Sequence, residues 1–265
     1  IMDVVRRHNI EPYDESTHTG LLRHIVTKVS SINGIFMVIL VINSRTNKLP
    51  KALIDSLMKI EAVASVYVNL NQSVGNVIFG KDMIHAAGAE YLEDVTCGIK
   101  HKVMPLSFRQ VNPEQTERLY TTAVELAGLS GNEIVFDAYC GAGVLSLLLA
   151  LRAKKVYGVE IVRQAIDAAL ANTKDNGISN AEFICGECEK MYPKLIEKGI
   201  KPDVIVVDPP RKGCDASVLE AFAYAGPKRI VYISCNPATL ARDIKILAEN
   251  GYMLSTVQPI DMFPQ

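Results

Sequence analysis

The second half of the chain alternates short apolar runs with longer segments of helical spacing. Six runs predict buried strands, at residues 134–138, 155–160, 181–185, 203–208, 229–234 and 251–259. Short buried strands that alternate with helices are typical of a parallel sheet with crossover connections. Residues 108–265 therefore predict an α/β domain with a mostly parallel sheet and helices on both faces.

The first 107 residues follow a different pattern. Apolar runs at 24–31 and 35–42 flank Ile32-Asn33-Gly34, and Asn-Gly is a strong hairpin signal. Helical spacing follows from Leu53 to Ala64, and strand character returns at 65–70 and 76–79. We expect a smaller mixed α/β subdomain over residues 1–107, separate from the domain at 108–265.

Charge and composition limit the function classes. The chain has 265 residues, 28 basic and 29 acidic side chains and 49% hydrophobic content, so it can bury a large core. A net charge near zero supplies no general field for nucleic acid, so any RNA binding must be local. No apolar run approaches the roughly 20 residues of a membrane span. The start of the sequence lacks signal-peptide architecture, and we expect a cytoplasmic protein without membrane association.

The six cysteines are too scattered for a disulfide framework. Cys185 and Cys188 alone are closely spaced, and a metal site would need two further ligands. We expect no metal, with Cys185 closing a buried strand and Cys188 lining a pocket.

A glycine-rich turn follows the strand at 134–138. Glycines such as Gly141 and Gly143 let a ligand approach the backbone, and the following helix supplies unpaired N–H groups, which implies a nucleotide-type cofactor. A dinucleotide fingerprint would have glycine at position 146, where Ser146 stands. Glu160 ends the next strand, 17 residues beyond Gly143, and is placed to bind ribose hydroxyls. Together with Asp137 in the strand and Asp208-Pro209-Pro210 at the tip of a later strand, this spacing favours S-adenosylmethionine over a nicotinamide.

Two later strand ends carry further candidate chemistry. Asp208 follows four apolar residues, and Cys235 stands between an apolar run and a helical pattern. A helix N-terminus stabilises a thiolate, so Cys235 is a candidate nucleophile. The alternative for Asp208 is an acid that caps a turn, and the alternative for Cys235 is a small buried residue. Tyr139 either packs beneath the glycine turn or contacts the methionine or adenosine part of the cofactor, and we favour the contact. Arg211 and Lys212 either belong to a solvated loop or meet phosphate.

Four segments resemble motifs of the RNA (uracil-5-)-methyltransferase family. They are DAYCGAG at 137–143, DPPRKG at 208–213, SCNPATLARD at 234–243 and SFRQVN at 107–112, where Arg109 replaces a phenylalanine of the family pattern. The resemblance implies a Rossmann-like class I methyltransferase domain that uses S-adenosylmethionine. Residues 20–24 point to the 23S ribosomal RNA branch of the family, whose members form 5-methyluridine during rRNA processing. We therefore expect the partner to be RNA, and we favour rRNA over tRNA as the substrate.

The resemblance also implies residue roles. Cys235 would add to carbon 6 of the uracil, and Asp208 would lie near the modified base. Gln110, Tyr139, Gly141, Glu160 and Asp208 would line the S-adenosylmethionine site. Residues 1–107 would face the RNA, and no obligate protein partner is implied.

Two features depart from the family pattern. The family's general base is a glutamate a few residues beyond the segment that resembles 261–265, so this base is absent from the sequence. The N-terminal RNA-binding barrel and the iron–sulfur cluster motif that occur in the family are not found either. We expect a fragment of a longer enzyme.

The alternative functions are a tRNA uridine-5 methyltransferase, an RNA cytosine-5 methyltransferase, an adenine-N6 methyltransferase and an inactive RNA- or cofactor-binding module. A cytosine-5 enzyme would place a cysteine where Arg211 stands, and an adenine-N6 enzyme would have an aromatic residue after the Pro-Pro pair and no need of Cys235.

Overall fold

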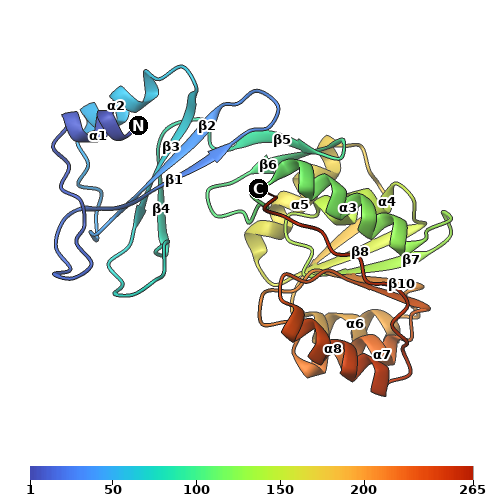
Figure 1. The fold of residues 1–265 in the computed structure, drawn as a ribbon. Helices are drawn as coiled ribbons and strands as arrows, with labels where there is room; N and C mark the ends of the chain where they lie inside the picture. Colours follow the sequence, from blue (N-terminus) through green and yellow to red (C-terminus); the bar gives the residue numbers. More distant parts are fainter. Residues whose placement is uncertain (265) are drawn as a thin grey trace. The chain divides into compact units, whose positions relative to one another are not determined.

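The computed structural model describes residues 1–264 and divides the chain into two compact units (Figure 1). One unit comprises Ile1–Asp94 with Lys102–Ser107, and the other comprises Val95–His101 with Phe108–Gln265. The change of unit at Phe108 coincides with the change of pattern in the sequence. Residues 95–101 cluster with the second unit, although the sequence analysis assigned them to the first.

The second unit is built on a five-stranded parallel sheet. Its strands are β7 (Ile134–Ala138), β8 (Lys155–Glu160), β9 (Ala181–Cys185), β10 (Val204–Val207) and β11 (Arg229–Tyr232), in the order β11-β10-β7-β8-β9. The chain starts in the centre at β7, runs outward to β9, and returns to the other side of β7 at β10. Ligands of such sheets bind at the carboxyl ends of the strands, where the order reverses.

Helices cover both faces of this sheet (Figure 1). One hydrophobic cluster contains buried residues of α3 (Pro113–Ala127), α4 (Val144–Ala150) and α5 (Arg163–Asp175), and a second contains residues of α6 (Cys188–Glu197), α7 (Ala216–Ala225) and α8 (Pro237–Glu249). Successive residues of β7 alternate between them, Val135 in the first and Phe136 in the second. The predicted fold class, a Rossmann-like parallel sheet with helices on both faces, is confirmed.

One strand prediction in this unit is wrong. Residues 251–259 form no strand. A strand exists only where its backbone groups pair with a neighbour, and no strand of the described chain pairs with this segment, which leaves Met253 and Val257 exposed. The predictions for β7, β8 and β9 match the structure residue for residue, and β10 and β11 are shorter than predicted.

The first unit has a four-stranded mixed sheet in the order β1-β2-β3-β4. Its strands are β1 (Leu22–Val29), β2 (Phe36–Ile42), β3 (Val63–Leu70) and β4 (Asp82–Gly88). Two helices, α1 (Met2–Arg7) and α2 (Lys51–Met58), pack with one face, and the predicted hairpin of β1 and β2 is confirmed.

Four parts of the first 107 residues differ from the predictions. The helix predicted from Leu53 to Ala64 ends at Met58, with Ala64 in β3, and β4 was not predicted. Residues 76–79 form a loop instead of a strand, because buried Asn71 donates its Nδ2 hydrogens to the carbonyls of Val77 and Ile78 at 2.7 and 2.9 Å. A two-stranded ribbon of β5 (Leu92–Thr96) and β6 (Ile99–Val103) was not predicted. Among residues 1–264, no helix has the length and apolar character needed to cross a bilayer.

Candidate active site

The loop between β7 and α4 has three residues with left-handed backbone angles, namely Tyr139 (φ 61°), Gly141 (φ 53°) and Gly143 (φ 80°). At Gly143 a Cβ would lie 2.7 Å from the ring of Phe183, so packing requires a glycine there. At Gly141 a Cβ would have no atom within 4 Å. Only Tyr139 has a side chain that makes this conformation unfavourable, by roughly 1–2 kcal/mol. The loop is therefore bent tightly and is open beside Gly141.

Glu160 ends β8, the neighbour of β7, and its carboxylate is fixed by two backbone amides. Its Oε2 accepts from the Gly141 N–H at 3.2 Å, and its Oε1 accepts from the Val162 N–H at 2.9 Å. Each carboxylate oxygen can accept a second hydrogen bond. The structure thus brings Glu160 and Gly141 together, as the predicted cofactor site requires.

Asp137 lies within β7 and is buried, with 1% of its surface exposed. Its Oδ2 accepts a hydrogen bond from the Ser146 hydroxyl of α4. Burial raises the pKa of Asp137 to about 7; the Ser146 hydrogen bond opposes the rise and the charges of Asp208 and Glu160 add to it. This pair was not predicted from the sequence, although its signal is visible there: serine stands at position 146, where a dinucleotide fingerprint has glycine.

Asp208 follows β10, on the other side of β7. Its backbone N–H donates to the Ala138 carbonyl at 3.4 Å, and burial raises the pKa of its carboxyl to about 6. Burial raises the pKa of the Tyr120 phenol of α3, and the charges of Asp208 and Asp137 add to the rise. Tyr120 was not among the predicted site residues, since its only sequence signal is helical spacing.

Cys235 occupies the turn between β11 and α8. Of the six cysteines, all in the described part of the chain, only Cys235 has an exposed side chain. The next residue, Asn236, is the N-cap of α8, and its Oδ1 accepts from the Ala238 N–H at 3.0 Å. The structure therefore excludes a buried small residue at this position and places an accessible thiol at a helix start.

The loops after β10 and β11 are hydrogen-bonded to each other. The Arg211 carbonyl accepts from Asn236 Nδ2 and from Thr239 Oγ1, both at 3.3 Å. Because β10 and β11 are paired in parallel register from Val204 to Val207, their carboxyl ends lie at one edge of the sheet. Asp208 and Cys235 are thus carried by two connected loops.

The closely spaced pair Cys185 and Cys188 lies on two sides of the sheet. Cys185 ends β9 and packs against the cluster of α3, α4 and α5, whereas Cys188 begins α6 and is buried in the other cluster. No three His, Cys, Asp or Glu side chains of residues 1–264 lie together as a metal site would require.

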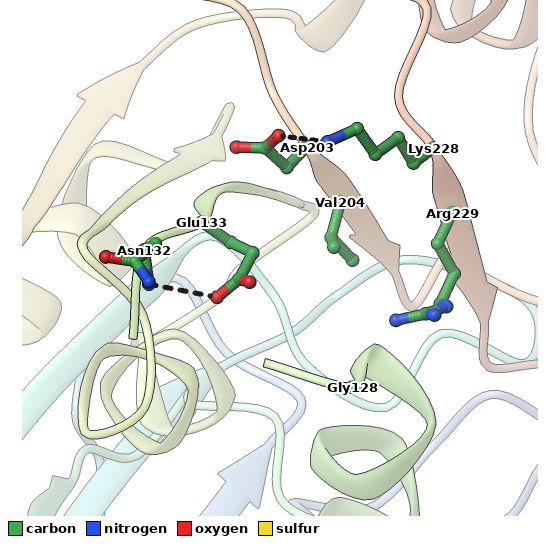
Figure 2. A pocket seen from close by; sticks show the side chains of 7 residues that line it. All are labelled: Gly128, Asn132, Glu133, Asp203, Val204, Lys228 and Arg229. Atoms are coloured by element: carbon green, nitrogen blue, oxygen red, sulfur yellow. Dashed lines mark hydrogen bonds and ion pairs between the residues drawn. The ribbon is translucent and has the colours of Figure 1, made fainter. Parts of the chain in front are cut away.

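A pocket of about 260 Å³ lies at the opposite, amino-terminal edge of the sheet (Figure 2). Its charged side chains are paired within the protein: Lys228 with Asp203 at 3.5 Å, and Arg229 Nη1 with the Ala127 carbonyl, the end of α3, at 2.6 Å. Glu133 accepts from Ser130 and the following amides. These contacts link the amino-terminal ends of the strands to the end of α3, and we assign the pocket a structural role.

The model of the family described as tRNA (Uracil-5-)-methyltransferase matches residues 72–265. The chain belongs to this family. An uncharacterized RNA methyltransferase of Clostridium tetani is 50% identical over 262 residues, which are 98% of this chain and 56% of the relative. A protein of the same description from Enterococcus faecalis is 47% identical over 268 residues, 100% of this chain and 58% of the relative. The chain thus spans little more than half the length of these relatives.

A solved structure gives a match over both units. It is the tRNA (uracil-54, C5)-methyltransferase of Pyrococcus abyssi in complex with S-adenosyl-L-homocysteine, with a TM-score of 0.81 and 28% identity, and it covers 99% of this chain and 62% of that one. The family and fold that the sequence motifs implied are therefore confirmed.

Two predicted cofactor residues have less support from the geometry. Tyr139 is half-buried and packs against the cluster of α6, α7 and α8, near Cys214 and Cys188, so both of its predicted environments remain compatible with the structure. Gln110 lies in the segment that leads to α3, two residues before its N-cap Asn112. Within residues 1–264 no hydrogen bond is recorded between Gln110 and the other predicted site residues.

Proposed function

We propose that this chain methylates carbon 5 of a uridine in RNA, with Cys235 as the nucleophile and S-adenosylmethionine as the methyl donor. The observation that carries the proposal is the exposed thiol of Cys235 on a loop that is hydrogen-bonded to the loop of Asp208. Membership of the family supports the reaction class, and the Pyrococcus abyssi relative is named as a uracil-C5 methyltransferase.

The residues at the carboxyl edge of β7 and β8 fit the proposed cofactor. The open space beside Gly141 admits a ligand to the backbone, and the fixed carboxylate of Glu160 has acceptor capacity for hydroxyl groups. With Tyr139, Asp208 and Gln110, these residues would hold S-adenosylmethionine. When bound, the cofactor would supply a methyl group on a sulfonium cation, from which a neutral thioether leaves.

Carbon 5 of uracil is a weak nucleophile, and in the proposed reaction Cys235 activates it. Its thiolate adds to carbon 6 of the uracil, which forms the C–S bond and moves the electron pair of the double bond toward carbon 5 and the carbonyl. After methylation, a base removes the proton from carbon 5, the double bond returns and the thiolate leaves. Since the ring must present its face to the thiol, the uridine is single-stranded or flipped out of a stack.

We favour 23S rRNA as the substrate because of the segment at residues 20–24. The alternative is tRNA, which the name of the Pyrococcus abyssi relative supports. Incubation with tritiated S-adenosylmethionine and either unmodified rRNA or unmodified tRNA, with the product identified by mass spectrometry, distinguishes them. Labelled 5-methylcytidine or N6-methyladenosine would refute the uridine assignment.

A covalent trap tests the nucleophile. In RNA with 5-fluorouridine at the target position, fluorine cannot leave as the proton does, so we expect a stable methylated protein–RNA adduct. Cys235→Ser should abolish the adduct. Cys185→Ser, at a half-buried cysteine, is the matched control and should retain it. An adduct that survives Cys235→Ser, or a peptide map that assigns it to another cysteine, would overturn the proposal.

A further inference from the structure

Asp243 of α8 is a fully buried carboxylate, with 0% of its surface exposed, two helical turns after Cys235. Its Oδ2 accepts from the Cys214 N–H at 2.8 Å and from the Tyr232 hydroxyl at 2.6 Å. Cys214 belongs to the loop that follows Asp208, and Tyr232 ends β11. One carboxylate thus joins the helix after the nucleophile, the strand before it and the loop of the neighbouring strand.

Arg242 continues the same connection. Its Nε donates to Asp243 Oδ1 at 2.7 Å, and its Nη2 donates to the carbonyls of Lys212 and Cys214, both at 3.0 Å. The first turn of α8 adds the two bonds from Asn236 and Thr239 to Arg211. Residues spaced by three and four lie on one helix face, so this face of α8 holds the backbone of residues 211–214 along its length.

Gly213 shows how close this approach is. Its backbone has φ 77°, and a Cβ there would lie 2.6 Å from both Arg242 Nη2 and Asp243 Oδ2. A side chain at position 213 would therefore push the loop away from the helix. We call the set of Asn236, Thr239, Arg242 and Asp243, with the backbone that they hold, the Asp243 clamp.

The burial of the Asp243 carboxylate, whose partner Arg242 is half exposed, calls for an explanation beyond stability. Taking a carboxylate from water costs several kcal/mol even when it is paired, and apolar residues of similar volume often stabilise a fold as well or better. What a charged, multiply hydrogen-bonded group provides is a fixed geometry for backbone groups that an apolar side chain cannot hold. Here the backbone so fixed lies between the acid Asp208 and the thiol-bearing turn.

We propose that the Asp243 clamp positions the Cys235 thiol against the loop that begins at Asp208, and that Asp243 is a positioning residue for thiolate addition. This inference rests on the proposed function, since it names the residue that holds its nucleophile in place. Asp243 is not assigned any contact with the uracil or the cofactor. Loss of the Asp243 carboxylate would slow thiolate addition by changing the position of the Cys235 loop relative to the Asp208 loop.

The test uses the 265-residue chain with RNA that carries 5-fluorouridine and with S-adenosylmethionine, both saturating. Asp243→Asn keeps the size of the side chain but removes its charge and one acceptor. We expect the rate of adduct formation to fall by about 10- to 100-fold, the scale of a misplaced reacting group. Binding of S-adenosylhomocysteine, measured by calorimetry, should stay within about twofold, because Asp243 is assigned no contact with the cofactor. Hydrogen exchange of the Cys214 amide should become faster.

Three further variants separate positioning from stability. Leu247→Ala removes a buried side chain from the same helix and should lower Tm without slowing the adduct at 25 °C. Thr239→Val removes a hydroxyl that donates to Arg211 and should slow the adduct, whereas Thr239→Ser keeps the hydroxyl and should restore the rate.

The outcomes are distinguishable. If the wild-type chain forms no adduct, the proposed function fails and the clamp loses its role with it. A wild-type adduct that forms equally fast in Asp243→Asn, with the Cys214 amide released, overturns the clamp alone. Equal slowing by Leu247→Ala would also overturn it, because the effect would then follow stability.

Discussion

The buried acid Asp137 makes stability depend on pH in a direction opposite to that of most carboxylates. Its pKa is raised from 3.8 to about 7, with burial as the largest cause. Below pH 3.8 the carboxyl is protonated in the folded and the unfolded chain. As the pH rises, the unfolded chain loses the proton first, so the folded state loses stability up to about pH 7. We predict that Asp137→Asn removes this loss.

The magnitude follows from the size of the shift. One pKa unit corresponds to about 1.4 kcal/mol, so a rise from 3.8 to about 7 destabilises the folded state by roughly 4 kcal/mol above pH 7. Between pH 5 and pH 8 the pH-dependent part changes by about 2–3 kcal/mol. The altered hydrogen bond with Ser146 adds an offset of about 1 kcal/mol that does not depend on pH.

Urea denaturation of both proteins at pH 5, 6, 7 and 8 without cofactor, followed by circular dichroism, measures this difference. The gain of Asp137→Asn over the wild type should increase with pH by about 2–3 kcal/mol. Asp55→Asn replaces an exposed carboxylate in α2 and should follow the wild type at every pH. A gain for Asp137→Asn that is constant from pH 5 to pH 8 would refute the reasoning, since it would show that Asp137 is ionised throughout.

Two predictions concern ligands. Glu160→Ala should weaken the binding of S-adenosylhomocysteine by roughly 1–3 kcal/mol in calorimetry, the scale of lost hydrogen bonds to a charged group, and unchanged affinity would remove Glu160 from the site. The chain itself should bind RNA weakly and with a shallow salt dependence between 50 and 200 mM in filter binding, because a net charge of −1 leaves few phosphates neutralised. Tight, sequence-selective binding would contradict this second expectation.

The centre of the parallel sheet was predictable because β7, β8 and β10 are buried on both faces. Val204 to Val207 are all buried, so the apolar run and the strand coincide. The segment 251–259 has a similar composition but no partner strand, and pairing is not encoded in the local sequence. The ribbon of β5 and β6 was missed for the opposite reason: Asp94 is buried within a strand, contrary to the apolar pattern.

The site could be predicted as far as it depends on strand ends. Glu160, Asp208 and Cys235 each follow an apolar run, and parallel strands bring their carboxyl ends to one edge. The contacts of Ser146 and Tyr120 depend instead on which helix face turns toward the sheet, which spacing alone does not determine. Gln110 came from family resemblance, and no apolar run marks its position.

The strand order gives a physical reason for assigning two roles to Asp208. Across the sheet the order is Cys235 after β11, Asp208 after β10, the glycine loop after β7 and Glu160 at the end of β8. Neighbouring strands are about 4.8 Å apart, so Glu160 and Asp208 are separated by two strand spacings, or about 10 Å. A cofactor bound over β7 therefore has Glu160 at one side and Asp208 at the other, and the thiol lies one strand further. In the proposed reaction Asp208 would thus be the acid between the cofactor and the nucleophile, where the carbon that accepts the methyl group would lie.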